Sequence, residues 1–360
     1  MKRVGYLFEQ VTDIEIIKLA IRNASRGKRK RKCVQRALAD IDGTALRIQQ
    51  MLLSGTYVPS PYKSFNIEDG PRKKARTIYC PEFYPDQIIH WALMLVMEPI
   101  FSKSMYEFSC GSVPNRGVHY GKKHIERWLR RDPENTKYCM KLDIKKYYPN
   151  VSRDILMKKF TTKIKDERFL RLVAQVVYSH TAGLPIGNYT SQWWANFYLE
   201  DTDHFIKETL HIPYYVRYMD DMVLFASSAE ELRKAMHEIR AHLHDLELDL
   251  KDNWQIFLTD SRPLDFMGFK FYRTHTTLRR SNSLRIRRRA IRIYKKAKVV
   301  VHDARAFLSY WGWIICSNSF MFYMRYIRPY VDITKLKEVI GYADRKQYQT
   351  KRARSIQALA

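Results

Sequence analysis

Two adjacent aspartates, Asp220 and Asp221, stand between two apolar runs that read as short strands over residues 214–226. Runs of this length, rich in Tyr, Val, Leu and Phe, are typical of buried strands. The carboxylate pair has two interpretations. It is the turn of an ordinary hairpin, although tight hairpins prefer Asn-Gly or Asp-Gly, or it is a functional site at the end of a sheet. Both interpretations require a sheet.

The rest of the chain alternates between helical and extended patterns. Extended segments are expected over residues 137–144 and 264–271, and helices over 34–53, 85–101, 152–160, 191–210 and 230–246. The strands lie far apart in the sequence, and helices separate them. We therefore expect an α+β fold, in which helices back a sheet, rather than an all-α or all-β fold.

Composition excludes several classes of protein. Apolar residues make up 46% of the 360 residues, which excludes a disordered chain. No apolar stretch approaches the roughly 18 residues of a membrane span, and the N-terminus carries no signal-peptide core. The five cysteines are scattered and form no C-x-x-C pair, which argues against a disulfide scaffold or a zinc site. We expect a cytoplasmic protein without membrane contact.

The charge is strongly positive and unevenly distributed. Lys and Arg number 64 against 37 Asp and Glu, a formal net charge of +27. Basic clusters occupy residues 26–32, 72–76 and 270–298, and the last holds twelve cations and no acid. A single basic run is commonly a solvated helix face, but repulsion within so dense a run needs a polyanion to relieve it. We expect a polyanionic partner.

A third carboxylate, Asp143, ends the extended segment 137–144. If Asp143 and Asp220 lie on adjacent strands about 4 Å apart, they repel by roughly 4 kcal/mol at an effective dielectric constant near 20. Divalent metal ions relieve such repulsion, and Mg²⁺ keeps positions open for substrate phosphates. Two such ions can activate a hydroxyl and stabilise a leaving pyrophosphate. Asp221 lies in the same field as an auxiliary ligand.

Several motifs together resemble the reverse transcriptase family. Residues 218–221 (Tyr-Met-Asp-Asp) resemble its Y-x-D-D motif, and residues 142–149 resemble the strand that bears its first metal-binding aspartate. Residues 76–87 are similar to its fingers segment, 183–188 to the start of its dNTP-side helix, and 264–269 to its primer grip. The order matches, and the resemblance covers roughly residues 55–275. It implies a right-handed polymerase with fingers, a palm with an antiparallel sheet, and a helical thumb.

The resemblance also implies a division of the chain and a reaction. Residues 1–55 are expected to form a basic helical extension, 56–275 the fingers and palm, and 276–360 a basic helical thumb. The implied reaction is RNA-templated DNA synthesis from dNTPs, with two Mg²⁺ ions, or Mn²⁺ in their place. Template RNA and the cDNA product are the implied partners, which agrees with the positive charge.

One motif points to a subtype. Most reverse transcriptase lineages carry Q-G-x-x-x-S-P, whereas residues 186–192 of this chain read I-G-N-Y-T-S-Q. This form resembles the enzymes of diversity-generating retroelements, which copy a template RNA with frequent errors at adenines. The resemblance implies a small basic accessory variability protein as a partner. An apolar side chain at the nascent base pair offers shape without a hydrogen bond, which agrees with low selectivity.

The resemblance assigns roles to individual residues. Asp143, Asp220 and Asp221 are the implied catalytic and metal-binding carboxylates, joined by the backbone carbonyl of Ile144. The implied substrate-binding residues are Arg76 and either Lys73 or Lys74 for the triphosphate, Tyr148 as a steric gate against NTPs, Lys251 as a proton donor to pyrophosphate, and Ile186, Gly187 and Gln192 near the template and primer. For Tyr148 the alternative is a core aromatic residue, and for the lysines a solvated loop.

Three other functions stay open from the sequence. A retron-type or phage-defence reverse transcriptase shares the catalytic residues but copies a different RNA. An RNA-dependent RNA polymerase uses NTPs. A non-catalytic RNA-binding scaffold keeps the fold without the reaction, although the three intact aspartates argue against it.

Overall fold

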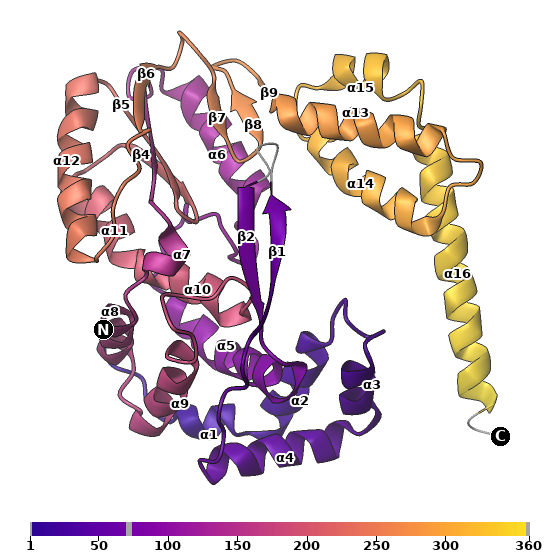
Figure 1. Cartoon of the computed structure of the whole chain (residues 1–360). Helices are drawn as coiled ribbons and strands as arrows, with labels where there is room; N and C mark the ends of the chain where they lie inside the picture. Colours follow the sequence, from indigo (N-terminus) through magenta and orange to yellow (C-terminus); the bar gives the residue numbers. More distant parts are fainter. Residues whose placement is uncertain (1, 70–73, 358–360) are drawn as a thin grey trace. The chain divides into compact units, whose positions relative to one another are not determined.

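The computed structural model describes residues 2–69 and 74–357. The chain divides into two compact units, each of which combines helices with a sheet (Figure 1). The first comprises Met1–Gly121 with Glu134–Phe257, and the second comprises Lys122–Pro133 with Leu258–Ala360. The expectation of mixed helices and strands is confirmed.

The first unit holds two sheets and most of the helices. Its strands are β1 (Lys63–Asp69), β2 (Lys74–Cys80), β3 (Tyr138–Asp143), β4 (Tyr214–Tyr218), β5 (Asp221–Ala226) and β6 (Gln255–Leu258). Its helices are α1 (Leu7–Val11), α2 (Ile14–Ala24), α3 (Lys32–Ala39), α4 (Ile41–Leu53), η1 (Phe83–Gln87), α5 (Ile88–Phe101), α7 (Tyr147–Asn150), α8 (Arg153–Lys163), α9 (Glu167–Val177), α10 (Tyr189–Tyr198), α11 (Glu200–His204), η2 (Phe205–Thr209) and α12 (Ala229–Asp245).

The second unit is a small sheet followed by helices. Its strands are β7 (Leu264–Phe266), β8 (Phe269–Phe271) and β9 (Thr276–Leu278), and its helices are α13 (Arg280–Tyr294), α14 (Val301–Ile315), α15 (Phe320–Tyr326) and α16 (Ile333–Gln357). Helix α6 (Val118–Arg131) enters this unit from the first. Phe269 stacks on Trp313 with ring centroids 5.0 Å apart, which ties β8 to α14.

The main sheet of the first unit has the strand order β4-β5-β3-β6. Strand β5 pairs antiparallel with both β4 and β3. Its side chains from Met222 to Ala226 are buried, because helix α12 packs against β3 and β5. The strands expected over 137–144 and 214–226 are therefore confirmed.

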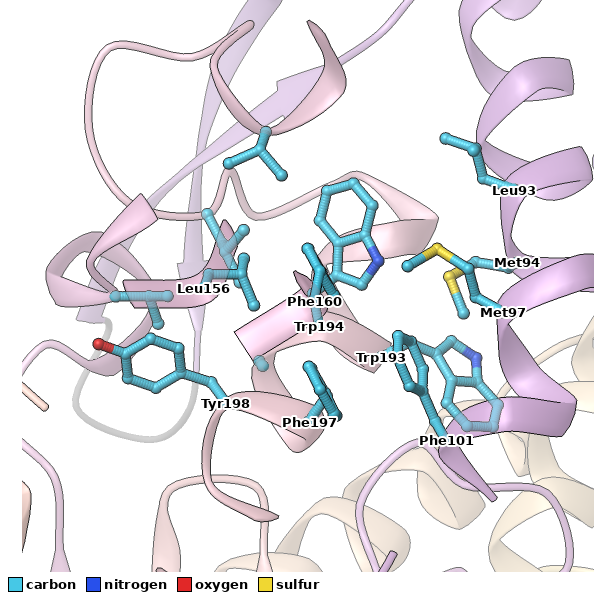
Figure 2. Packing of buried hydrophobic residues seen from close by; sticks show 14 of the residues in the cluster. Leu93, Met94, Met97, Phe101, Leu156, Phe160, Trp193, Trp194, Phe197 and Tyr198 are labelled. Atoms are coloured by element: carbon cyan, nitrogen blue, oxygen red, sulfur yellow. The ribbon is translucent and has the colours of Figure 1, made fainter. Parts of the chain in front are cut away.

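An aromatic core lies beside this sheet. Helices α5, α8 and α10 meet through Phe101, Phe160 and Phe197, whose ring centroids lie 4.5–6.0 Å apart (Figure 2). Trp193 and Trp194 of α10 are buried in the same cluster. Burying aromatic side chains removes a large apolar area from water and stabilises the unit.

Three expected elements are divided in the structure. The helix expected over 34–53 breaks at Asp40, whose carboxylate accepts from the Gly43 amide at 2.8 Å and caps α4. The helix expected over 191–210 is three segments, α10, α11 and η2. The extended segment 264–271 is the hairpin β7–β8, because Met267 and Gly268 adopt φ values of 47° and 82°. Local turn chemistry overrides the longer apolar pattern at these points.

The β1–β2 hairpin ends near residues that the sequence assigns to the triphosphate. Arg72 and Lys73 lie outside the described residues, as does the side chain of Lys74, whose backbone begins β2.

Over residues 2–69 and 74–357, no helix has the length and apolar character to cross a bilayer.

Candidate active site

Strand pairing brings the three aspartates to one end of the main sheet. Asp143, the last residue of β3, pairs with Asp221, the first residue of β5. Tyr218 closes the β4–β5 hairpin opposite Asp221, so Met219 and Asp220 form the turn. We call Met219 and Asp220 the active-site turn. The third carboxylate therefore lies on the strand next to the hairpin.

The active-site turn is strained and held from three sides. Met219 has a φ of 56°, an uncommon conformation for a residue that is not glycine. The Ile144 amide donates to the Asp220 carbonyl at 3.3 Å, and Arg217 Nη1 donates to the Met219 carbonyl at 3.0 Å. A Cβ at Gly111 would overlap Met219, so only glycine permits this close packing.

Beneath the turn lies a fully buried ion pair. Arg217, on β4, is 0% exposed, and its Nε and Nη2 donate to the two Asp203 carboxylate oxygens at 2.7 and 2.5 Å. Tyr215 donates to the same carboxylate at 2.7 Å, and Asn196 Oδ1 accepts from Arg217 Nη1 at 3.0 Å. Burial alone would lower the pKa of Arg217, but the Asp203 carboxylate outweighs it and holds that pKa above its ordinary value.

The loop before α6 completes this network. Cys110 N donates to the Arg217 carbonyl at 2.7 Å, and Arg217 N donates to the Phe108 carbonyl at 3.0 Å. Asn196 Nδ2 donates to the Gly111 carbonyl at 2.6 Å. Residues 108–111 thus lie along the outer edge of β4 and fix Gly111 against the active-site turn.

The carboxyl groups of Asp220 and Asp221 are harder to ionise than ordinary aspartates. Burial, with the negative charge of Asp143, raises the pKa of Asp220. Burial also raises the pKa of Asp221 to about 6, although Lys141 at 4.0 Å opposes the rise. The raised pKa values of both carboxyls therefore report mainly their burial, and the neighbouring carboxylates add to the effect.

Lys251 reaches the same site from a distant segment. Its ammonium group donates to Asp143 Oδ1, and its amide donates to the Asp143 carbonyl at 2.8 Å. Ile144 forms a bridge with Leu250, and the Lys145 amide donates to the Asp249 carbonyl at 2.8 Å. Residues 249–251 are therefore fastened along the end of β3, and a cation lies on Asp143.

Arg76 and Tyr148 also lie in the field of the turn. Arg76, on β2, lowers the pKa of Asp220 through its charge, and it acts in the same direction on Tyr148. Tyr148 is half-buried beside Tyr147, with ring centroids 5.7 Å apart. Burial and the Asp220 charge raise the pKa of Tyr148, so its hydroxyl stays protonated.

The I-G-N motif packs against β2 and not against the active-site turn. The Tyr79 amide donates to the Ile186 carbonyl at 2.8 Å. Gly187 has a φ of 135°, and a Cβ there would overlap the Tyr79 carbonyl oxygen. This packing alone requires glycine at position 187, whether or not a nucleic acid also approaches it. Gln192 is exposed on α10.

Sequence reasoning missed the buried Arg217–Asp203–Asn196 network. An arginine inside an apolar strand reads as a solvent-facing residue, and its partners come from separate helices. The sequence does carry one signal for this network. A single charged residue, Arg217, stands between apolar or aromatic residues in β4. A charge at such a position is buried only when it is paired.

Comparisons with known proteins agree with this geometry. Residues 67–271 match the family model "Reverse transcriptase (RNA-dependent DNA polymerase)". The chain is 22% identical over 315 residues to the group II intron-encoded protein LtrA of Lactococcus lactis subsp. cremoris, with 67% of this chain and 52% of that protein covered. It is 26% identical over 172 residues to protein YkfC of Escherichia coli (strain K12), with 45% of each chain covered. The chain thus spans about half the length of these curated relatives.

A solved structure supports the fold. Apo telomerase from Candida tropicalis aligns with 81% of this chain and 58% of its own, at 12% identity and a TM-score of 0.50. That likeness is one of fold alone, and it agrees with a right-handed polymerase. The family match covers more than half of the residues and includes all three aspartates. The chain belongs to the reverse transcriptase family.

Proposed function

We propose that this chain is an RNA-directed DNA polymerase that adds dNTPs to a primer 3′-hydroxyl. The observation that carries the proposal is the register of β3 with β5, which sets Asp143 beside Asp221 with Asp220 at the adjoining turn. Family membership supports the same reaction. In this assignment the first unit contains fingers and palm, and the helices after β9 form the thumb.

The donor chemistry at the turn fits Mg²⁺. Asp143, Asp220 and Asp221, with the Ile144 carbonyl, offer hard oxygen ligands, and the raised carboxyl pKa values favour added positive charge. Among the described residues, no group of three or more His, Cys, Asp and Glu side chains is close enough to hold a metal ion. Mg²⁺ often binds proteins through one or two carboxylates plus substrate phosphates. We assign two Mg²⁺ ions here, or Mn²⁺ in their place.

When bound, two such ions supply charge that activates the attacking hydroxyl and stabilises the leaving pyrophosphate. The protein's part is to hold the ligands in place. Arg217 and Ile144 fix the backbone of the active-site turn through the Met219 and Asp220 carbonyls. The buried ion pair costs no reorganisation during the reaction, so the turn is preorganised.

Lys251 and Arg76 are assigned to the phosphates. Lys251 neutralises Asp143 in the free enzyme. If metal ions and substrate compensated Asp143 instead, the Lys251 ammonium would be free to donate a proton to the departing pyrophosphate. Arg76 offers a planar fork that suits a triphosphate oxygen pair, and Lys74, at the start of the same strand, offers a point charge.

Tyr148 is assigned to sugar selection. Its half-buried ring lies in the field of Asp220, where the sugar of an incoming nucleotide would lie. The ring would clash with a 2′-hydroxyl and favour dNTPs over NTPs. Ile186 and Gly187, in the loop before α10, and Gln192, on α10, are assigned to the nascent base pair and the template.

Primer extension on a defined RNA template tests the polymerase assignment. Asp220→Ala should abolish extension while RNA affinity stays within about twofold of the parent, because this change removes a reacting-centre ligand and no basic side chain. Asp252→Asn, at an exposed acid beside Lys251, is the control and should extend normally. Full extension by Asp220→Ala would overturn the site. Replacing dNTPs with NTPs separates this activity from an RNA-dependent RNA polymerase.

For the subtype, we propose an error-prone enzyme of a diversity-generating retroelement that works with a small basic accessory protein. The motif at residues 186–192 supports this assignment. The group II intron-encoded relative, 22% identical, represents the competing lineage. Sequencing cDNA made on co-purified RNA distinguishes the two. Substitutions concentrated at template adenines support the retroelement, and uniform low error contradicts it. Ile186→Gln should then lower the adenine error rate.

A further inference from the structure

A cavity in the second unit joins cations to aromatic rings. It has a volume of about 410 Å³ and lies between β8, β9, α13 and α15, which are neighbours in Figure 1. Its lining includes three cations and three aromatic residues: Lys270, Arg280, Arg287, Tyr272, Phe322 and Tyr326. We call it the cation–aromatic pocket. None of the described residues that line it is an acid.

The strand alternation of β8 builds one wall. Phe269 and Phe271 are buried, so Lys270 and Tyr272 point to the other face of the sheet. Thr277 of β9 pairs with Lys270 and lines the same wall. One face of Tyr272 is covered by His275, with centroids 4.3 Å apart and planes at 6°, which leaves the other face for a ligand.

The helices build the opposite wall and fix its charge. Arg287 and Arg325 both lie over the Tyr326 ring, at 4.9 and 5.5 Å, so a base that stacks on Tyr326 must displace one of these cation–π contacts. Phe322 lies one helical turn before Tyr326, with centroids 5.8 Å apart. Lys270, Arg280 and Arg287 form no ion pair with any described acid, although Arg279, between β9 and α13, pairs with Asp265. The cations of the pocket are therefore available to an anion.

The walls are anchored to each other. Asn282 Nδ2 and the Arg279 amide both donate to the Gly268 carbonyl at 3.0 Å, which ties α13 to the β7–β8 turn. Asn318 N donates to the Thr276 carbonyl at 2.7 Å, and its side chain accepts from the Thr276 amide at 3.0 Å, which ties the start of α15 to β9. A pocket fastened in this way is preformed, as ligand sites usually are.

We propose that the cation–aromatic pocket binds one unpaired nucleotide of a single-stranded nucleic acid, with its base on the aromatic rings and its phosphate on the cations. The volume lies within the range of small-ligand sites, about 300–1,000 Å³. Aromatic stacking accepts any base, and the cations track the backbone. A paired base cannot enter, because its faces are covered by its neighbours. We therefore expect the pocket to bind single-stranded nucleic acid and not a duplex. This proposal rests on the nucleic-acid function proposed above.

Equilibrium binding of fluorescein-labelled octamers to the full chain tests this. The probes are oligo(A) RNA, oligo(dA), an abasic octamer with the same phosphates, and a blunt RNA–DNA duplex, all without Mg²⁺ and dNTPs. Tyr326→Leu should weaken binding of the two base-bearing octamers about tenfold and of the abasic octamer and the duplex less than about twofold, which corresponds to the loss of one stacked base. Tyr342→Leu, at an exposed tyrosine of α16, is the control and should change none of these.

A second variant, at an exposed charged residue, tests the pocket without disturbing the fold. Arg287 is exposed on α13, so Arg287→Gln leaves the core intact and should reduce the preference for base-bearing over abasic octamers. Arg292→Gln changes the same charge on α13 outside the pocket and should keep that preference. A 4-thiouridine octamer should photo-crosslink to peptides that contain Tyr272 or Tyr326.

The outcomes separate this proposal from the polymerase assignment. Equal weakening of duplex and single strands by Tyr326→Leu would make the pocket part of a duplex track and overturn it. Crosslinks confined to the first unit would overturn it too. Absence of primer extension by the parent chain would instead contradict the polymerase assignment and leave the octamer result standing. Comparison of oligo(A) with oligo(dA) shows whether the nucleotide comes from RNA or DNA.

Discussion

At the scale of single residues, Arg217 links the stability of the fold to the reaction. Removing only the arginine leaves the Asp203 carboxylate buried and uncompensated, so Arg217→Leu should cost about 3–5 kcal/mol of unfolding free energy. Arg217→Leu with Asp203→Leu removes both charges and should recover most of that loss. The Met219 carbonyl still lacks its donor in the double variant.

The double variant therefore isolates positioning from folding. We expect kcat to fall about tenfold and the Mg²⁺ concentration for half-maximal rate to rise, with the KM for dNTP changed less than about twofold, because one hydrogen bond to the turn is lost. Tyr215→Phe is the matched control. It removes one donor to Asp203, should cost about 1 kcal/mol, and should keep kcat. Parental kcat in the stable double variant would show that Arg217 is only structural.

Gly187 is a second residue at which backbone geometry decides the outcome. Its φ of 135° and its close approach to Tyr79 leave no space for a methyl group. Gly187→Ala should lower the unfolding free energy by at least about 2 kcal/mol. Gly117→Ala, in the same unit, meets nothing within 4 Å and should change it by less than about 0.5 kcal/mol. Urea unfolding measures both, and equal midpoints for the two variants would contradict the packing.

At the scale of elements, α5 carries a buried titratable group. His90 is 2% exposed, its Nδ1 has no hydrogen-bond partner in the described part of the chain, and burial lowers its pKa to about 3. The unfolded chain binds a proton below about pH 6.5, whereas the folded chain does not until about pH 3. Stability is therefore lost as the pH falls through this window, by about 1.4 kcal/mol per unit.

Chemical unfolding at pH 7.5 and pH 5 measures this effect. The parent chain should lose about 2 kcal/mol through His90 between pH 6.5 and pH 5. His90→Gln should remove that part of the pH dependence whatever its effect on absolute stability. His237→Gln, at an exposed histidine of α12, is the control and should keep the parental slope. The same slope in all three proteins would contradict a neutral, buried His90.

Elements also show what sequence patterns can and cannot predict. Strands β3, β4 and β5 follow from their apolar runs, and the functional reading of Asp143, Asp220 and Asp221 follows from their places at strand ends. The contact of Lys251 with Asp143 joins residues 108 apart, and no local pattern encodes it. The residue's role came from family resemblance instead. The burial of Arg217 was missed because polarity normally predicts exposure, and pairing reverses that rule.

At the scale of the whole molecule, the charge of +27 divides among different tasks. Some cations are already engaged within the protein: Arg217 is buried in its pair with Asp203, and half-buried Lys28, in the 26–32 cluster, donates to Gln87 at 2.5 Å. Others, such as Arg285 and Arg288 on α13, are exposed. Exposed cations supply most contacts to RNA phosphates, so the formal charge overstates the number of those contacts.

The salt dependence of RNA affinity counts those contacts. Each phosphate neutralised on a single strand contributes about 0.7 to the slope of log affinity against log salt concentration, so about six contacts should weaken binding at least about 100-fold between 50 and 200 mM salt. Arg285→Gln with Arg288→Gln should lower the slope by about 1.4 if both side chains contact phosphates. Lys28→Gln should leave it unchanged, because this cation is already used inside the protein. A slope near zero in the parent would mean that the charge serves solubility, and that RNA is held by shape and stacking alone.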